Sequence, residues 1–263
     1  MGQEDRRAVE ALEKSSLQLA EVVEGLGPDQ LERPSQCAGW SLGKVLSHIG
    51  SGSEIFGRFV EAALAGETLP GPDTFPAVWE RWDSLGAERL SEAAVAAAAG
   101  LAARFGGLDD HELEVGLELF GMDVTVGTLA GWRLVEQSLH TWDLVAADDD
   151  SATLDADLAD VVARHVAGLA LRIAKPTDPP GRWVLETAGI RARRFELVST
   201  DPVQFSELTG TDAAPGEGTV TVTLALESMV RLVTGRLDPS HTPTGIRAPA
   251  GELDRLRAVF PGY

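Results

Sequence analysis

The stretch TLAGWRLVEQSLHTWDLVAA, residues 128–147, places a carboxylate and an imidazole on one apolar face of an expected helix. Glu136 and His140 are four residues apart, so their side chains project from the same face, one helical turn apart. Asp143 lies near this face, whose other members are the apolar residues Leu129, Trp132, Val135 and Leu139. Because an unpartnered buried carboxylate is costly, the pattern predicts a compensating group for Glu136, such as a divalent cation.

A second imidazole, His48, lies on the apolar side of another helix expected over residues 41–64. One glutamate and two histidines with an open coordination position are typical of a catalytic rather than a structural metal site. Two other interpretations stay open at this point. Glu136 could pair with Arg133 on the helix surface, and His48 could be a satisfied core histidine. Spacing alone does not show that the two helices meet.

Apolar residues recur at helical spacing through the first two thirds of the chain, which predicts an all-α domain over residues 1–175. Turn-forming glycines and prolines separate the expected helices. These helices cover residues 8–26, 41–64, 76–105, 128–147 and 154–174, with a less regular segment at 108–127.

After Lys175 the chain changes character, because three prolines mark a linker and short strand-like runs follow it. We expect strands at residues 182–187, 191–199 and 219–224, and the last of these alternates strictly between apolar and polar residues. Short helices are expected at 226–233 and 251–259, and a polar loop at 210–218. The sequence therefore predicts a small α+β domain over residues 181–263.

Composition narrows the possible partners. The 263 residues include 22 Lys+Arg and 41 Asp+Glu, a formal net charge of −19, which argues against binding to nucleic acid or to anionic lipid. The single cysteine, Cys37, excludes an intrachain disulfide and fits a reducing compartment. Residues 1–24 lack the apolar centre of a signal peptide, and no apolar run is long enough to span a bilayer. We therefore expect a cytoplasmic protein.

The stretch LERPSQCAGWSLGKVLSH, residues 31–48, resembles the entry to the metal-binding domain of mycothiol-dependent maleylpyruvate isomerases. A second signature of that family resembles WRLVEQSLHTWD, residues 132–143. These proteins belong to the DinB-like superfamily of four-helix-bundle metalloproteins, and many members append a small α+β domain related to sterol carrier proteins. The resemblance implies both domains here, and it implies a metal, expected to be zinc, held by His48, Glu136 and His140.

The resemblance also implies a chemistry. A metal ion with an open position favours the thiolate form of a bound thiol, which is mycothiol in this family. The thiolate then adds to a small electrophilic molecule, and the outcome is either isomerisation or S-transfer. A non-catalytic protein that binds a metal or a small hydrophobic ligand is the alternative. The chain is expected to be a monomer or a homodimer, and the sequence does not decide between them.

Several other residues are candidates for supporting roles. Asp143 is placed to orient the imidazole of His140. An anionic substrate would favour an arginine, and the family resemblance implies one from the C-terminal domain. We expect Arg236 rather than Arg231 to meet the substrate. Cys37 could be a reactive thiol, a fourth ligand or an inert core residue. The tryptophans near the site could line a pocket or pack in the core, and they are Trp40, Trp132 and Trp142.

One position departs from the family pattern. Members usually carry an acidic residue three positions after the Ser or Thr that begins the second helix, whereas this chain has Lys44 there. The carboxylate of a capping box is therefore missing after Ser41, which weakens the expected start of the helix but leaves the ligands unaffected.

Overall fold

The computed structural model describes residues 2–189, 192–209 and 218–262, and its contacts divide the chain into two compact units. Unit 1 covers Met1–Asp148 and unit 2 covers Asp149–Tyr263. Within the described residues, no helix is long and apolar enough to cross a membrane.

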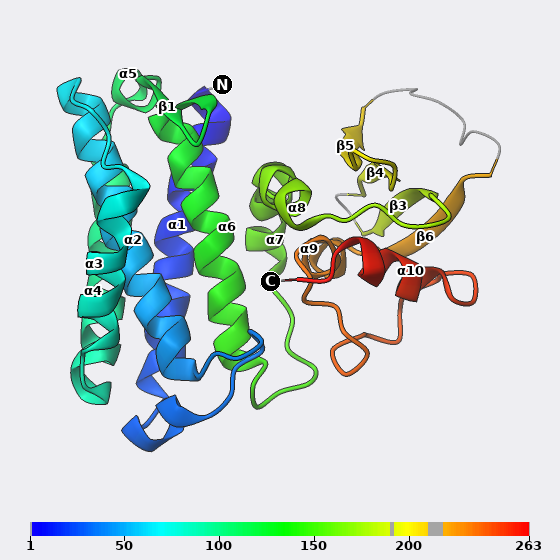
Figure 1. Ribbon diagram of the computed structural model, residues 1–263, viewed down its shortest axis with the longest axis horizontal. Coiled ribbons are helices and arrows are strands. Elements are labelled where there is room, and N and C mark those ends of the chain that lie inside the picture. Colours follow the sequence, from blue (N-terminus) through cyan, green and yellow to red (C-terminus); the bar gives the residue numbers. More distant parts are fainter. Residues whose placement is uncertain (1, 190–191, 210–217, 263) are drawn as a thin grey trace. The chain divides into compact units, whose positions relative to one another are not determined.

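Unit 1 is a four-helix bundle, as the sequence predicted (Figure 1). Helices α1 and α2 each pack against both α4 and α6, so their apolar stripes enclose one core. The bounds are α1 Gly2–Glu24, α2 Leu42–Ala65, α4 Ala87–Gly106 and α6 Val126–Val145. Fully buried side chains of this core include Leu12, Leu46, Phe59, Phe105 and Leu134.

The expected helix over residues 76–105 is wrong as one element, because the structure breaks it between α3 (Phe75–Asp83) and α4. Ser84 ends α3 by bonding its amide to Glu80 and its hydroxyl to the carbonyl of Arg81, and Gly86 is extended. The break lets α3 lie on α2, where the ring of Trp82 covers Gly50. A Cβ at Gly50 would collide with that ring, so glycine is required for this approach.

The segment at 108–127 is more ordered than expected. It contains α5 (Asp110–Leu113) and an antiparallel hairpin of β1 (Gly116–Leu119) and β2 (Met122–Thr125). Phe120 and Gly121 form its two-residue turn with positive φ of 56° and 77°, the conformation that favours glycine. Two 3-10 helices complete unit 1, η1 Pro28–Glu32 and η2 Pro72–Thr74.

Unit 2 contains a four-stranded sheet in the order β5-β4-β3-β6, which confirms the small α+β domain. Strand β3 pairs in parallel with β6, while the β3–β4 and β4–β5 pairs are antiparallel. Helix α9 packs on β3, β6 and α7. The strands are β3 Arg182–Ala188, β4 Arg194–Val198, β5 Gln204–Leu208 and β6 Val220–Ala225. The helices are α7 Ala156–His165, α8 Ala167–Ile173, α9 Leu226–Val233 and α10 Glu252–Val259.

Three expectations for this half differ from the structure or fall outside it. The helix expected at 154–174 is two helices, α7 and α8, which meet at Val166 and belong by contact to unit 2. The domain boundaries expected at 175 and 181 stay a prediction, while the contacts divide the chain after Asp148. The loop expected at 210–218 lies outside the described residues except for Gly218, as does Arg191 at the start of an expected strand.

Candidate metal centre

The candidate site lies in unit 1, near the start of α2 and the end of α6, which pack against each other. Ser41 caps α2 by accepting a 3.2 Å hydrogen bond from the amide of Lys44. Lys44, which stands where the capping-box carboxylate is missing, forms an ion pair through Nζ with Asp83 of α3, at 2.6 Å. The helix that carries His48 is thus anchored at its first turn.

The structure brings His48, Glu136 and His140 together. His48 Nε2 lies 3.2 Å from Glu136 Oε2, and His140 Nε2 lies 3.6 Å from the same oxygen. All three ligand atoms lie within 4.8 Å of one another. The two imidazole rings meet edge to face, with centroids 4.6 Å apart. The two helices therefore meet as the metal hypothesis requires, and ligation itself stays a prediction.

This donor set fits a divalent cation. Ligands 2.0–2.1 Å from a tetrahedral zinc ion lie about 3.3 Å from one another. The two imidazole nitrogens lie at similar distances from Glu136 Oε2, 3.2 Å and 3.6 Å. Two imidazoles and one carboxylate match the chemistry of catalytic zinc, which keeps a further position for water or substrate. The side chains of His48 and Glu136 are 31% and 27% exposed, so one side of the cluster is reachable from solvent.

The charges of the three residues depend on one another. Burial opposes ionisation of Glu136, but hydrogen bonds from His140 and His48 outweigh burial and hold its pKa well below the usual range. Burial also opposes protonation of His140, yet bonds to Asp143, Cys37 and Glu136 raise its pKa well above the usual value. For His48, burial dominates and lowers the pKa. In the absence of metal, these contacts favour the ionised form of Glu136 and the protonated form of His140.

Arg133 does not lie on the helix surface as the alternative interpretation of Glu136 required. Its side chain is 1% exposed, and its Nη2 atom donates to the carbonyl of Ile49 on α2 at 3.0 Å. Burial lowers the pKa of Arg133 to about 10, although Glu136 favours its charge. The partners of Glu136 in the structure are thus the two histidines.

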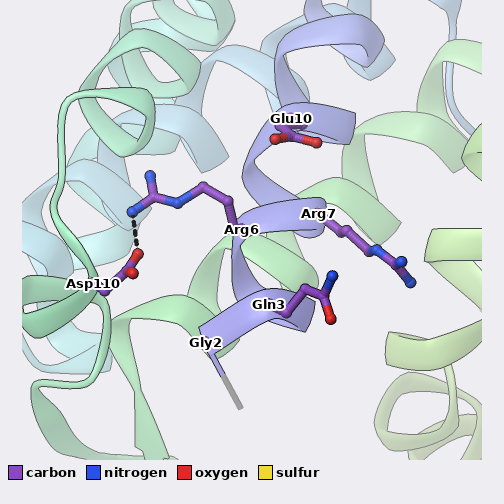
Figure 2. A pocket seen from close by; sticks show the side chains of 6 residues that line it. All are labelled: Gly2, Gln3, Arg6, Arg7, Glu10 and Asp110. Carbon is purple, nitrogen blue, oxygen red and sulfur yellow. Dashed lines mark hydrogen bonds and ion pairs between the residues drawn. The ribbon is translucent and has the colours of Figure 1, made fainter.

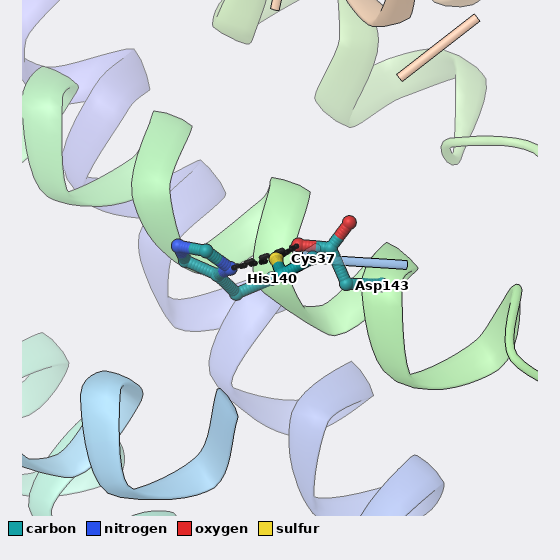
Figure 3. A group of neighbouring side chains, drawn as sticks. All are labelled: Cys37, His140 and Asp143. Carbon is teal, nitrogen blue, oxygen red and sulfur yellow. Dashed lines mark hydrogen bonds and ion pairs between the residues drawn. The ribbon is translucent and has the colours of Figure 1, made fainter. Parts of the chain in front are cut away.

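Asp143 is fully buried and accepts a 2.8 Å hydrogen bond on Oδ2 from His140 Nδ1 (Figure 3). Cys37 Sγ donates to the same oxygen at 3.1 Å and lies 3.7 Å from His140 Nδ1. His140 therefore faces Asp143 and Cys37 with one ring nitrogen and Glu136 with the other. Sequence spacing suggested the Asp143 contact but gave no sign of the one to Cys37.

The three tryptophans near the signatures have different surroundings. The ring centroid of Trp40 lies 5.1 Å from that of His48 and 5.9 Å from that of His140, so this indole packs on both imidazoles. Trp142 is 3% exposed and belongs to the core, while Trp132 is half-buried. Trp40 is the aromatic side chain that the structure places at the candidate ligands.

The two candidate arginines lie in unit 2. Arg231 is 1% exposed, pairs with Glu227 at 2.8 Å and donates to the carbonyl of His241 at 2.8 Å, so its charge is already used inside the unit. Arg236 follows α9, is half-buried and donates to the carbonyl of Thr234 at 3.2 Å. A substrate contact by Arg236 stays a prediction.

A separate surface pocket of about 440 Å³ lies at the start of α1 (Figure 2). Arg6 lines it but is held by Asp110 at 2.6 Å, while Arg7 is exposed. None of its lining residues belongs to the histidine cluster, and they are Gly2, Gln3, Arg6, Arg7, Glu10 and Asp110.

Comparison with known proteins gives concordant matches. The family model described as Mycothiol maleylpyruvate isomerase N-terminal domain matches residues 12–145, which include all three candidate ligands. Two uncharacterized proteins of Mycobacterium tuberculosis, from strains CDC 1551 / Oshkosh and ATCC 25618 / H37Rv, are each 28% identical over 152 residues, 58% of this chain and 72% of theirs.

Two crystal structures share the fold. One is a mycothiol-dependent maleylpyruvate isomerase, with a TM-score of 0.66 and 18% identity over 94% of this chain and 93% of that chain. The other is a mutant of the mycothiol-dependent maleylpyruvate isomerase, with a TM-score of 0.63 and 17% identity over 88% and 89% of the two chains.

Proposed function

Since this chain belongs to the mycothiol maleylpyruvate isomerase N-terminal domain family, we propose that it is a metal-dependent thiol enzyme. In this proposal His48, Glu136 and His140 hold a divalent cation, with zinc as the expected ion. The observation that supports it best is the convergence of their three ligand atoms within 4.8 Å, from two helices, on a partly exposed face. When bound, the cation would make a low-molecular-weight thiol acidic enough to ionise.

The chain's own residues have distinct tasks in this proposal. Glu136 supplies the anionic ligand, because its two histidine partners keep its pKa low. Asp143 holds His140 by its Nδ1 atom at 2.8 Å, which leaves Nε2 directed toward Glu136. Trp40 packs on both imidazoles and limits the rotation of the rings. Arg236 is the proposed contact for an anionic group of the substrate.

The proposed reaction is addition of the thiolate to an electrophilic carbon of a small molecule. If that carbon belongs to a cis double bond, addition permits rotation about the bond, and elimination of the thiolate returns the trans isomer with unchanged mass. Mycothiol and a maleylpyruvate-like acid are the proposed pair, since structures of this fold carry those names. Transfer without elimination would instead leave a thioether.

The test combines metal analysis with mass spectrometry of the full-length chain. We expect about one zinc per wild-type chain, and loss of the metal in each of the three ligand variants, His48→Ala, Glu136→Ala and His140→Ala. With mycothiol and a cis electrophile, the wild type should return an isomer of the same mass. A persistent adduct would mean S-transfer, and a wild type that takes up no metal even after reconstitution would refute the proposal.

A further inference from the structure

Cys37 lies in a tightly bonded turn just before α2. The amide of Ser35 donates to the carbonyl of Trp40 at 2.9 Å, and the amide of Trp40 donates to the carbonyl of Cys37 at 3.0 Å. The Cys37 amide in turn donates to the Ser35 hydroxyl at 3.1 Å. Gln36 fastens the turn to the end of α6 through a 3.1 Å bond to the carbonyl of Ala146. The backbone of Cys37 is therefore held at both its amide and its carbonyl.

The thiol points at the carboxylate that orients His140. Oδ2 of Asp143 receives the thiol at 3.1 Å and the Nδ1 of His140 at 2.8 Å, and the side chain of Asp143 is 1% exposed. An ionised carboxylate can only accept, so both partners must donate to it. Nδ1 of His140 consequently carries a hydrogen, so in the neutral imidazole the lone pair that a metal requires lies on Nε2.

We propose that Cys37 is a positioning residue: its thiol fixes Asp143, and Asp143 fixes the tautomer and direction of the His140 ring. This rests on the proposed function in one respect, namely that His140 is a ligand through Nε2. The sulfur lies on the Nδ1 side of the ring, whereas Glu136 and His48 lie on the Nε2 side. Cys37 therefore acts through the carboxylate rather than on the bound ion.

The competing assignment makes Cys37, His140 and Asp143 a ligand set of their own, since these three ligand atoms also lie within 4.8 Å of one another. The two assignments predict opposite results for one substitution. Serine keeps a hydrogen-bond donor but removes the thiolate, so Cys37→Ser preserves positioning and destroys ligation. Cys37→Ala removes both.

The experiment measures Zn²⁺ affinity by chelator competition in the wild-type chain, Cys37→Ser and Cys37→Ala. We expect Cys37→Ala to bind about tenfold more weakly and Cys37→Ser to stay within about threefold of the wild type. Cobalt-substituted wild type should show no sulfur-to-cobalt charge-transfer band in the near ultraviolet. The inference would be overturned if all three chains had equal affinities, or if Cys37→Ser bound Zn²⁺ as weakly as Cys37→Ala. The presence of the charge-transfer band would also overturn it.

A second measurement needs no metal. Imidazole NMR of the metal-free chain should show a hydrogen-bonded His140 Nδ1–H that exchanges slowly in the wild type and in Cys37→Ser. In Cys37→Ala we expect this hydrogen to exchange at least about tenfold faster, because Asp143 is no longer fixed. If the wild type binds no Zn²⁺, the proposed function fails, and unchanged exchange in Cys37→Ala would separately refute the role of Cys37.

Discussion

His140 in unit 1 and His241 in unit 2 are both buried, and both hold an aspartate by the Nδ1 atom. The Nδ1–Oδ2 distance is 2.8 Å for His140 and Asp143, and 3.0 Å for His241 and Asp238. Their side chains are 10% and 2% exposed. At Nδ1, each of the two histidines thus contacts an aspartate carboxylate.

The other nitrogen distinguishes them. Nε2 of His140 faces Glu136, which also touches His48 on a second helix, so three ligands converge. Nε2 of His241 lies 3.8 Å from Asp150, whose side chain is 84% exposed. Among the described residues, both candidate ligand groups contain His140 and neither contains His241. An aspartate on Nδ1 therefore marks an oriented histidine, and only convergence at Nε2 indicates a metal site.

The largest expected effect is the difference in Zn²⁺ affinity between variants of the two histidines. His140→Ala should weaken Zn²⁺ binding by more than about 100-fold, because even partners outside the ligand set commonly cost 10–100-fold. His241→Ala should leave affinity within about threefold, since it removes no proposed ligand. Chelator competition on both purified variants measures this. Equal losses in the two would mean that the assignment to unit 1 is wrong.

The next effect tests the two aspartates. Asp143→Asn should weaken Zn²⁺ binding by about 10-fold to 100-fold, because an amide can present its NH₂ to Nδ1 and so favour the wrong tautomer. Asp238→Asn is the matched control, and its Zn²⁺ affinity should equal that of the wild type. Isothermal titration of both variants gives the answer, and an unaffected Asp143→Asn would remove the orienting role.

The pH dependence of the metal-free chain is a further test. Because the pKa of His140 is raised from 6.5, its contribution to stability is complete below that pH and is lost as pH rises through the raised value. The free energy of unfolding should therefore fall in urea titrations as the pH rises above about 6.5. His140→Gln should remove this slope. With Zn²⁺ bound the slope should disappear, because the metal displaces this proton from the folded chain.

The smallest expected effect concerns the start of the helix that carries His48. Lys44 and Asp83 are about two-fifths exposed, so their ion pair is screened by solvent. Lys44→Ala should lower the free energy of unfolding by about 0.5 kcal/mol, and Zn²⁺ affinity should not change. Paired urea and zinc titrations check both statements. A large loss of affinity would show that this ion pair holds His48 in place.

Local periodicity was sufficient to predict one half of the candidate site. Glu136 and His140 share a face because they are four residues apart on one helix, and the same spacing brought Asp143 close. The meeting of His48 with Glu136 required knowledge of which helices pack together, and the family resemblance supplied it. Cys37 and Asp143 are 106 positions apart, so their bond is a product of tertiary packing alone.

The fold shows the same division between local and tertiary information. The bundle helices and strand β6 follow from clear periodicity, whereas the sequence of β5, QFSEL, alternates too little to be recognised. The buried position of Arg133 was also missed, because its charge suggested a surface residue and the side chain instead reaches the α2 carbonyl of Ile49. Strand pairing determines the position of β5, and the contact between α2 and α6 determines that of Arg133.

The two occupied nitrogens of His140 have an entropic consequence. An imidazole bonded on one edge can flip by a half-turn and exchange its nitrogens, but Asp143 at Nδ1 and Glu136 at Nε2 oppose that flip. The rotational freedom of the ring is therefore lost when the chain folds and not when an ion arrives. Calorimetry should accordingly find a smaller unfavourable entropy of zinc binding in the wild type than in Asp143→Ala, where the ring is released.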